Sequence, residues 1–144
     1  MIILSGSSNQ PLANKIAGEL NCPLAEVEIS KFPNGEKRVW VKSDLNEKTV
    51  AIIQSFSEPV DEHIIEFTLL ADACKHLNAK KIIAVVPWFG YSPQDKSFRP
   101  GEPVSAHVIA RIIETVGVDQ FITVDIHSKK TLEFFSIPTL EISS

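Results

Sequence analysis

The sequence predicts an α/β fold, with a mainly parallel sheet flanked by helices and a small hairpin around residues 24–42. Expected strands and helices alternate along the whole chain, which is typical of sheets whose parallel strands are joined by helical crossovers. In addition, residues 81–86 and 120–124 form nearly continuous apolar runs rich in β-branched side chains. Strands of this kind are usually covered on both faces, and we therefore expect both to lie inside the sheet.

The composition indicates one ordinary globular domain, which we expect to comprise residues 1–144. A net charge of −4 at neutral pH gives no electrostatic basis for binding nucleic acid. Cys22 and Cys74 are too few for a disulfide framework or a cysteine-based metal site. No apolar run approaches the roughly 18 residues of a membrane span. We therefore expect a cytoplasmic protein that contacts neither nucleic acid nor membrane.

The first segment of the chain is expected to form a strand, a turn and a helix. Residues 1–4 are apolar, and residues 5–9 (Ser-Gly-Ser-Ser-Asn) form a polar turn. Apolar positions in residues 11–20 recur at helical spacing, and Pro11 suits the first turn of a helix. A serine- and glycine-rich turn before a helix could hold an anion, although such turns are also common without a ligand.

A hairpin is expected next, because two short runs with alternating apolar side chains flank a turn signal. The runs are residues 24–29 and 37–42, and the turn is Phe-Pro-Asn-Gly-Glu at residues 32–36. Proline presets one backbone angle in such a turn, and Asn-Gly tolerates positive φ. The β-branched run at residues 49–53 should form another strand.

A long helix is expected at residues 60–77, where an apolar stripe at i+4 steps includes Ile65 and Leu69. His63 and His76 fall on the polar side of this helix, and His107 opens the next one, so we interpret all three as solvated or helix-terminal histidines. The later elements are expected to be a strand at residues 81–86, a helix at 104–116, a strand at 120–124, a helical turn at 131–135 and a strand at 139–142.

Residues 85–105 are expected to form a long loop, because six proline and glycine residues interrupt them. The loop begins at the carboxyl end of an expected strand, which is where open α/β sheets usually bind ligands. Loops of this length are usually functional when they are ordered. Its polar and charged side chains, which make it a candidate site, are Gln94, Asp95, Lys96, Arg99 and Glu102.

A second candidate site follows the strand expected at residues 120–124. Asp125 and His127 are two positions apart, so their side chains would point the same way on a continuing strand. Mg²⁺ prefers carboxylate and phosphate oxygens, which makes Asp125 the more natural ligand of the two. An aspartate that caps a turn beside an ordinary surface histidine is the alternative interpretation.

Several short motifs occur one after another along the chain. They are Phe-Pro-Asn-Gly-Glu at 32–36, Gln-Ser at 54–55, Pro-Trp-Phe-Gly-Tyr at 87–91, Gln-Asp at 94–95, Glu-Pro-Val-Ser-Ala at 102–106 and Val-Asp-Ile-His at 124–127. In order and spacing they resemble the N-terminal half of the ribose-phosphate pyrophosphokinase (phosphoribosyl pyrophosphate synthetase) family. The segment at residues 131–135 is closer to the archaeal-type members.

The resemblance implies an enzyme with a type I phosphoribosyltransferase-like fold that transfers the β,γ-diphosphoryl group of ATP to the 1-hydroxyl of ribose 5-phosphate, with Mg²⁺. It implies that the 32–36 turn reaches into a neighbouring subunit's site to hold adenine, so that the protein is a homo-oligomer. By resemblance, the ATP-binding residues are Phe32, Asn34, Gly35, Glu36, Gln94, Asp95, Lys96 and Arg99, and the metal-binding residues are His127 and Asp125.

Two departures from the family modify that expectation. Pro93 stands where the family usually has an arginine before the Gln-Asp pair, so Lys96 or Arg99 would have to supply the charge. The family's ribose-phosphate-binding loop and mobile catalytic loop lie in its C-terminal half, which the resemblance does not cover. We therefore expect the ATP-binding domain of the enzyme, inactive alone. The alternative is a non-catalytic regulatory subunit associated with the synthetase.

Overall fold

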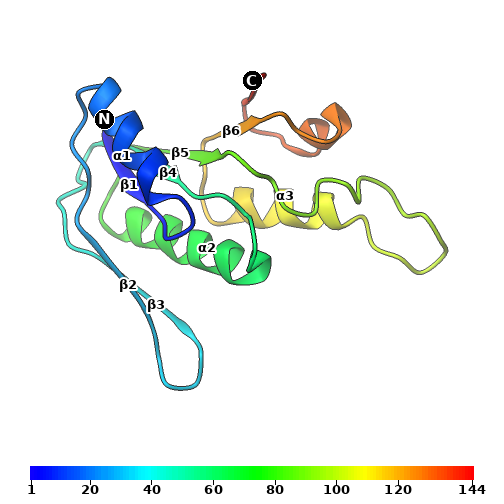
Figure 1. The fold of residues 1–144 in the computed structure, drawn as a ribbon, viewed down its shortest axis with the longest axis horizontal. Helices are drawn as coiled ribbons and strands as arrows, with labels where there is room; N and C mark the ends of the chain where they lie inside the picture. The colour runs from blue at the N-terminus through cyan, green and yellow to red at the C-terminus, as the bar shows by residue number, and fades with distance from the viewer.

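Five parallel strands form the central sheet, in the order β1-β4-β5-β6-β7 (Figure 1). The computed structural model describes residues 1–144. The strands are β1 (Ile2–Ser5), β4 (Thr49–Ile53), β5 (Lys81–Val86), β6 (Gln120–Val124) and β7 (Thr139–Ile142). β5 is the middle strand and β6 lies between β5 and β7, which confirms that the two most apolar expected strands are internal to the sheet.

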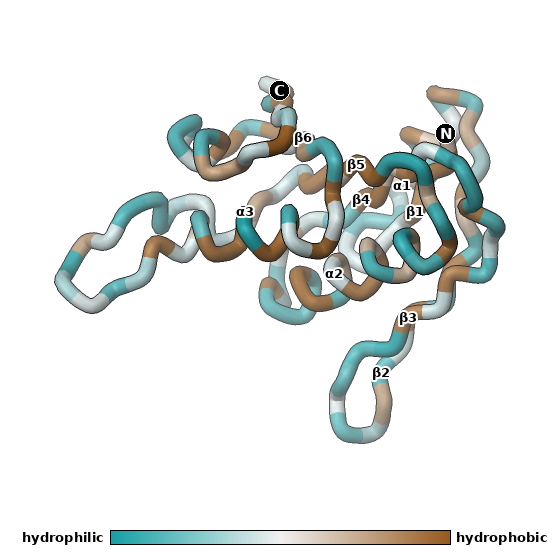
Figure 2. Tube along the Cα trace, turned by 180° about the vertical axis from the view of Figure 1, so that it is seen from behind, coloured by the Kyte–Doolittle hydropathy of each residue, from teal (hydrophilic) through white to brown (hydrophobic).

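Helices cover both faces of this sheet, because strand side chains alternate between the faces. α2 (Val60–His76) and α3 (Ser105–Thr115) pack on one face, and α1 (Gln10–Glu19) packs on the other. A short 3₁₀ helix, η1 (Lys129–Phe134), follows β6. Figure 2 shows β5 as part of an apolar centre between these helices. None of the helices has the length and apolar character needed to cross a membrane.

The two cores differ in size because two helices cover one face and a single helix covers the other. The larger core lies under α2 and α3, and its members include Leu4, Ile52, Phe67, Leu70, Ile82, Ile113 and Phe121. The smaller core lies under α1 and consists of Ile3, Ala13, Ala17, Ala51 and Ile53.

The hairpin is a separate two-stranded antiparallel sheet, formed by β2 (Val27–Lys31) and β3 (Lys37–Val41). It projects from the body of the molecule with its turn at the far end (Figure 1), and β3 contacts α2. The structure confirms the hairpin but begins its first strand at residue 27 instead of 24. Leu24 forms an isolated parallel bridge to Ile3, because this segment first runs alongside β1.

The buried face of α2 differs from the stripe expected from the sequence. Ile65 and Leu69 are 53% and 36% exposed. Apolar residues occur around much of the circumference of α2, so their spacing alone does not select the face that meets the sheet. The face that the helix buries consists of His63, Ile64, Glu66, Phe67, Leu70, Ala71 and Cys74.

Of the two alternatives expected for His63, the solvated one is wrong, whereas the helix-terminal one agrees with its place in the first turn of α2. Its residue is only 9% exposed, and its Nδ1 lies 2.7 Å from the carbonyl oxygen of Ser57. This hydrogen bond satisfies Nδ1 of the nearly buried ring, so His63 has a structural role at the start of α2. His107 is half-buried and its ring centroid lies 4.9 Å from that of Phe134, whereas His76 is exposed as expected.

Candidate functional site

A small cleft opens where β5 and β6 end. Because these strands are parallel, their carboxyl ends lie at one edge of the sheet, and the loops that follow them meet there. The cleft has a volume of about 140 Å³ and is lined by Trp88, Phe89, Ser92, Pro93, Val124, Asp125, Ile126 and His127. The fold therefore brings the long loop after β5 together with the Asp125 and His127 segment.

Asp125 departs from strand geometry at this edge. Its φ of 42° lies in the left-handed region, so the alternation of a regular strand does not orient Asp125 and His127. The Asp125 carboxylate accepts hydrogen bonds from the Ser144 hydroxyl and from the Ser144 backbone N–H, the latter at 3.0 Å. These bonds hold the pKa of Asp125 below its ordinary value. The carboxylate is thus ionised and exposed, and His127 is exposed beside it.

Asp95 reaches the same edge from the loop after β5. A hydrogen bond with the Ser128 side chain is the main cause that lowers the pKa of Asp95, and the charges of Lys130 and Lys96 act in the same direction. The ionised carboxylate therefore lies beside the segment that directly follows His127. Asp95 and Ser128 come from different loops, and the parallel pairing of β5 with β6 brings these loops to one edge of the sheet.

Gln94 supports the loop from within. Its side-chain oxygen accepts a hydrogen bond from the Ser105 hydroxyl at 2.7 Å, and its side-chain nitrogen donates to the Pro103 carbonyl at 3.2 Å. Its backbone carbonyl accepts from the Ala106 N–H at 3.1 Å. Gln94 thus connects the middle of the loop to its end and to the start of α3. Both the oxygen and the nitrogen of its side chain already form hydrogen bonds within the protein.

The two basic candidates of this loop, Lys96 and Arg99, lie further along it. Lys96 Nζ is 5.3 Å from the centroid of the Phe98 ring, and Arg99 Nε is 2.5 Å from a Glu102 carboxylate oxygen. Neither lines the cleft, whereas Pro93 does. The lining of the cleft therefore contains neither lysine nor arginine.

The 32–36 turn is well formed but lies apart from this cleft. Gly35 has a φ of 90°, and the Asn34 side-chain oxygen accepts a hydrogen bond from the Glu36 N–H at 3.1 Å. The Phe32 N–H donates to the Glu36 carbonyl at 2.8 Å, and the Phe32 residue is 46% exposed. Figure 1 shows the turn and the loop before α3 at two separate corners of the molecule. One chain does not bring these two groups of residues together.

The 5–9 turn is occupied by the protein itself. The Ser7 N–H and hydroxyl both donate to the Glu66 carboxylate at 2.7 Å. The Ser8 N–H and hydroxyl both donate to the Gln54 side-chain oxygen, at 3.1 and 2.7 Å. These donors are therefore not available to an external anion.

Sequence reasoning missed Glu66 as a structural carboxylate. The only available signal was its helical phase, one position before the buried Phe67. Gln54 belongs to the Gln-Ser motif at residues 54–55, which marked it as a candidate. The motif did not reveal that its side chain forms hydrogen bonds with Ser8, His63 and Glu66 inside the protein.

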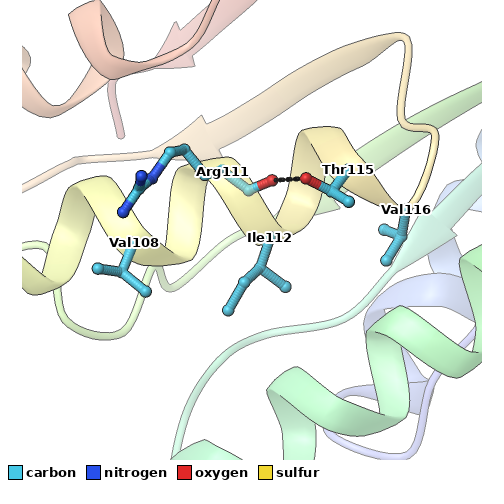
Figure 3. Close-up of a pocket in the computed structure, with 5 residues that line it drawn as sticks. All are labelled: Val108, Arg111, Ile112, Thr115 and Val116. Carbon is cyan, nitrogen blue, oxygen red and sulfur yellow. Dashed lines mark hydrogen bonds between the residues drawn. The ribbon is translucent and has the colours of Figure 1, made fainter.

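A second hollow, of about 360 Å³, lies along the outer side of α3 and is lined by Val108, Arg111, Ile112, Thr115 and Val116. Figure 3 shows that all five side chains come from this one helix and its end. Its internal hydrogen bond joins the Thr115 hydroxyl to the Arg111 carbonyl at 2.7 Å. Arg111 is the sole ionisable residue in this lining, so the hollow lacks the convergent polar groups of a catalytic site.

Residues 1–117 match the family model described as the N-terminal domain of ribose phosphate pyrophosphokinase. The chain belongs to the ribose-phosphate pyrophosphokinase family. The matched segment includes both the 32–36 turn and the whole loop between β5 and α3. Most of the candidate site residues therefore lie in the segment that matches the family model. The chain corresponds to the N-terminal domain of a ribose-phosphate pyrophosphokinase.

Individual relatives agree with the family match. The ribose-phosphate pyrophosphokinase of Methanobrevibacter smithii is 45% identical over 143 residues, which are 99% of this chain and 48% of the relative. That of Methanopyrus kandleri is 40% identical over 144 residues, which are 100% of this chain and 49% of the relative. The chain spans about half the length of the curated relatives it matches.

The fold also matches a solved structure. The crystal structure of phosphoribosylpyrophosphate synthetase from Mycobacterium smegmatis is similar with a TM-score of 0.95 and 30% sequence identity. The match covers 99% of this chain and 48% of that one. The expected fold, a mainly parallel sheet with flanking helices and a small hairpin, is therefore confirmed.

Proposed function

We propose that this chain forms the ATP-binding half of a ribose-phosphate diphosphokinase, which transfers the diphosphoryl group of ATP to the 1-hydroxyl of ribose 5-phosphate. The observation that carries the proposal is the cleft at the ends of β5 and β6, beside which Asp95 meets the segment with Asp125 and His127. Two loops that converge at a sheet edge can hold a polyphosphate from two sides. In this proposal, ribose 5-phosphate is bound by residues outside this chain.

The adenine of ATP is assigned to the 32–36 turn of a second copy of the chain. The ring of Phe32 is half-exposed, so it can stack on a base. Asn34, Gly35 and Glu36 follow it in the same turn and carry backbone and side-chain polar groups that could bind the base. Because the turn lies apart from the cleft of its own chain (Figure 1), the proposal requires a homo-oligomer, which we place in the cytoplasm.

The donor atoms at the cleft suit a magnesium ion that arrives with nucleotide phosphates. No group of three or more histidine, cysteine, aspartate or glutamate side chains forms a complete metal site. Mg²⁺ at such sites usually takes one or two carboxylates, substrate phosphates and several waters, and Asp125 offers one ionised carboxylate with His127 beside it. When bound there, the ion would neutralise charge on the phosphates during transfer.

The residues of this chain would act by positioning, since phosphoryl-group transfer depends mainly on alignment and charge stabilisation. Asp125 would hold the metal, and His127 would donate a hydrogen bond to a phosphate oxygen. Gln94 would act indirectly, because its hydrogen bonds to Ser105 and Pro103 hold the loop that carries Asp95.

A second candidate function is a non-catalytic regulatory subunit of the synthetase, and the observation that favours it is Pro93. Pro93 lines the cleft without a charge, while Lys96 and Arg99 interact with their own loop neighbours Phe98 and Glu102. Such a subunit would keep the fold and the subunit contacts but bind nucleotide weakly.

The Pro93→Arg substitution is expected to tighten binding of Mg²⁺–ATP. A hydrogen bond to a charged group contributes about 1.5–3 kcal/mol, so the dissociation constant should fall about tenfold or more. Isothermal titration calorimetry on the wild type and the variant measures this change. Asn46→Arg is the matched control, because it adds the same charge at an exposed position that does not line the cleft. Equal affinities for all three proteins would contradict the role assigned to the cleft.

The 144-residue chain alone is expected to form no phosphoribosyl pyrophosphate from ATP, Mg²⁺ and ribose 5-phosphate. Positioning of both substrates supplies most of the acceleration in such a transfer, and the 5–9 turn, which was the other candidate for holding a phosphate, is filled by Glu66 and Gln54. Product formation is measured by a coupled assay with radiolabelled ATP. Product above background that disappears in His127→Ala would show that one chain holds a complete site.

A further inference from the structure

Two lysines flank the 32–36 turn and both face α2. Lys31 and Lys37 are direct partners in the β2–β3 register. Lys31 Nζ lies 2.9 Å from a Glu62 carboxylate oxygen, and Lys37 Nζ lies 3.1 Å from a Glu66 carboxylate oxygen and 3.9 Å from Glu62. The turn is therefore connected to α2 on both of its sides.

The lysine pair continues the inner face of the hairpin. Side chains alternate along strands, so the register places three cross-strand pairs on the side toward α2: Val27 with Val41, Ile29 with Val39, and Lys31 with Lys37. The first two pairs belong to or pack against the main core. Apolar packing thus ends before the turn, and the last attachment on this face consists of the ion pairs that the two lysines form with Glu62 and Glu66.

The shortest ion pairs of the two lysines, Lys31–Glu62 and Lys37–Glu66, differ greatly in burial. Lys31 and Glu62 are both substantially exposed, and pairs of this kind contribute little because water and salt screen them. The Lys37 side chain is only 12% exposed and that of Glu66 is 0% exposed. Removing one partner of a buried pair leaves an uncompensated charge, so the Lys37–Glu66 contact is the dominant one.

Glu66 connects this contact to the central sheet. Its carboxylate also accepts hydrogen bonds from the Ser7 N–H and hydroxyl at 2.7 Å and from the Gln54 side-chain nitrogen at 2.6 Å. Ser7 follows β1 and Gln54 follows β4. Both strands end at the same sheet edge as β5 and β6, because the whole sheet is parallel.

We propose that Lys37 is a positioning residue, which fixes the orientation of the 32–36 turn relative to the sheet edge through the buried carboxylate of Glu66. The proposal rests on the proposed function only in the purpose it gives to the turn, namely contact with a nucleotide in a neighbouring subunit. If the turn binds a nucleotide in a neighbouring subunit, no ligand in its own chain holds it. Its orientation must then be set by its contacts with α2.

Hydrogen–deuterium exchange tests the proposal on the wild-type chain and three variants. In Lys37→Met the three hydrogen-bonded amides of the turn, those of Phe32, Gly35 and Glu36, should exchange faster by about tenfold or more, since a charged hydrogen bond is lost. Lys31→Met is the matched control and should change their exchange far less. Lys37→Arg, which keeps the charge, should restore protection. Unchanged exchange in Lys37→Met, or equal effects of Lys31→Met and Lys37→Met, would overturn the proposal.

A double variant separates positioning from general stability. Lys37→Met alone leaves a buried charge, which could loosen the whole fold. Lys37→Met with Glu66→Gln removes both charges, so β5 should regain its protection while the turn keeps exchanging fast. Recovery of the turn together with β5 would show that Lys37 acts only on overall stability and would contradict the proposal.

The outcome does not depend on whether nucleotide binds. If calorimetry detects no Mg²⁺–ATP binding to the wild type while the turn loosens as described, the proposed function fails and the positioning role stands. If nucleotide binds to the wild type and the turn is equally protected in Lys37→Met, the positioning role fails and the proposed function stands.

Discussion

Glu66→Leu is expected to lower the free energy of unfolding by about 3–5 kcal/mol, the usual cost of breaking a buried charged network from one side. Glu66 is fully buried, and its carboxylate accepts from Ser7, Gln54 and Lys37. Leucine satisfies none of these donors, and the nearly buried ammonium of Lys37 would lose its main partner. Urea unfolding followed by circular dichroism measures the change.

Glu62→Leu is the matched control for this measurement. Glu62 lies one turn earlier on the same helix and its ion pair with Lys31 is exposed, so its loss should have a much smaller effect. A similar loss of stability in both variants would show that burial of the Glu66 network is not the cause.

The hydrogen-bond network of Glu66 also makes the stability of the protein depend on pH. Burial alone would raise the pKa of Glu66, but hydrogen bonds from Ser7 and from Lys37, together with the charge of Lys37, outweigh it and hold the pKa below the ordinary value of 4.5. A carboxyl whose pKa is lowered on folding stabilises the protein above its unfolded pKa. This stabilisation is lost as the pH falls below 4.5 and through the folded pKa. Glu66→Gln should weaken the dependence of stability on pH in that window.

Gly90→Ala is expected to destabilise the fold by about 1–3 kcal/mol, the usual cost of overpacking. A Cβ at residue 90 would lie 2.5 Å from the Phe56 carbonyl oxygen and 2.9 Å from Val60 Cγ1. The N–H of Phe56 donates to the Trp88 carbonyl at 2.8 Å. The Phe56 backbone therefore cannot move away from the new methyl group without disturbing the loop after β5. The variant should therefore also bind Mg²⁺–ATP more weakly.

Gly18→Ala provides the control for Gly90→Ala. Gly18 lies in α1 with no atom within 4 Å of an added Cβ, so alanine should stabilise the protein by about 0.5–1 kcal/mol through its higher helix propensity. Thermal unfolding of both variants gives the comparison. Equal stability of wild type and Gly90→Ala would mean that the loop can shift to accept the methyl group.

Local patterns were sufficient to predict most of the sheet. β4, β5, β6 and β7 begin and end where their apolar or β-branched runs do, because strand formation in a covered sheet depends on those runs. The hairpin was also predictable, since Asn-Gly in the 32–36 turn requires little help from the rest of the fold. Its first strand began later than expected because Leu24 pairs with β1, a contact that alternation within the hairpin cannot reveal.

The candidate site was predictable in its residues but not in its arrangement. The long loop and the pair Asp125 and His127 each stood out by composition, and the structure places them around one cleft. The proximity of Asp95 to Ser128 depends on β5 and β6 being neighbours. Gln94 was expected to contact ATP, yet its side chain is committed to the loop and to the start of α3.

Fold class, element order and family could all be predicted from the amino-acid sequence, because they depend on short-range periodicity, turn chemistry and motifs of adjacent residues. The buried face of α2, and with it the structural roles of His63 and Glu66, became clear only in the folded chain. A helix with apolar residues on several sides can pack in more than one rotation. The choice between those rotations depends on partners distant in the chain, such as Ser7, Lys37 and Gln54, whose contacts no local pattern encodes.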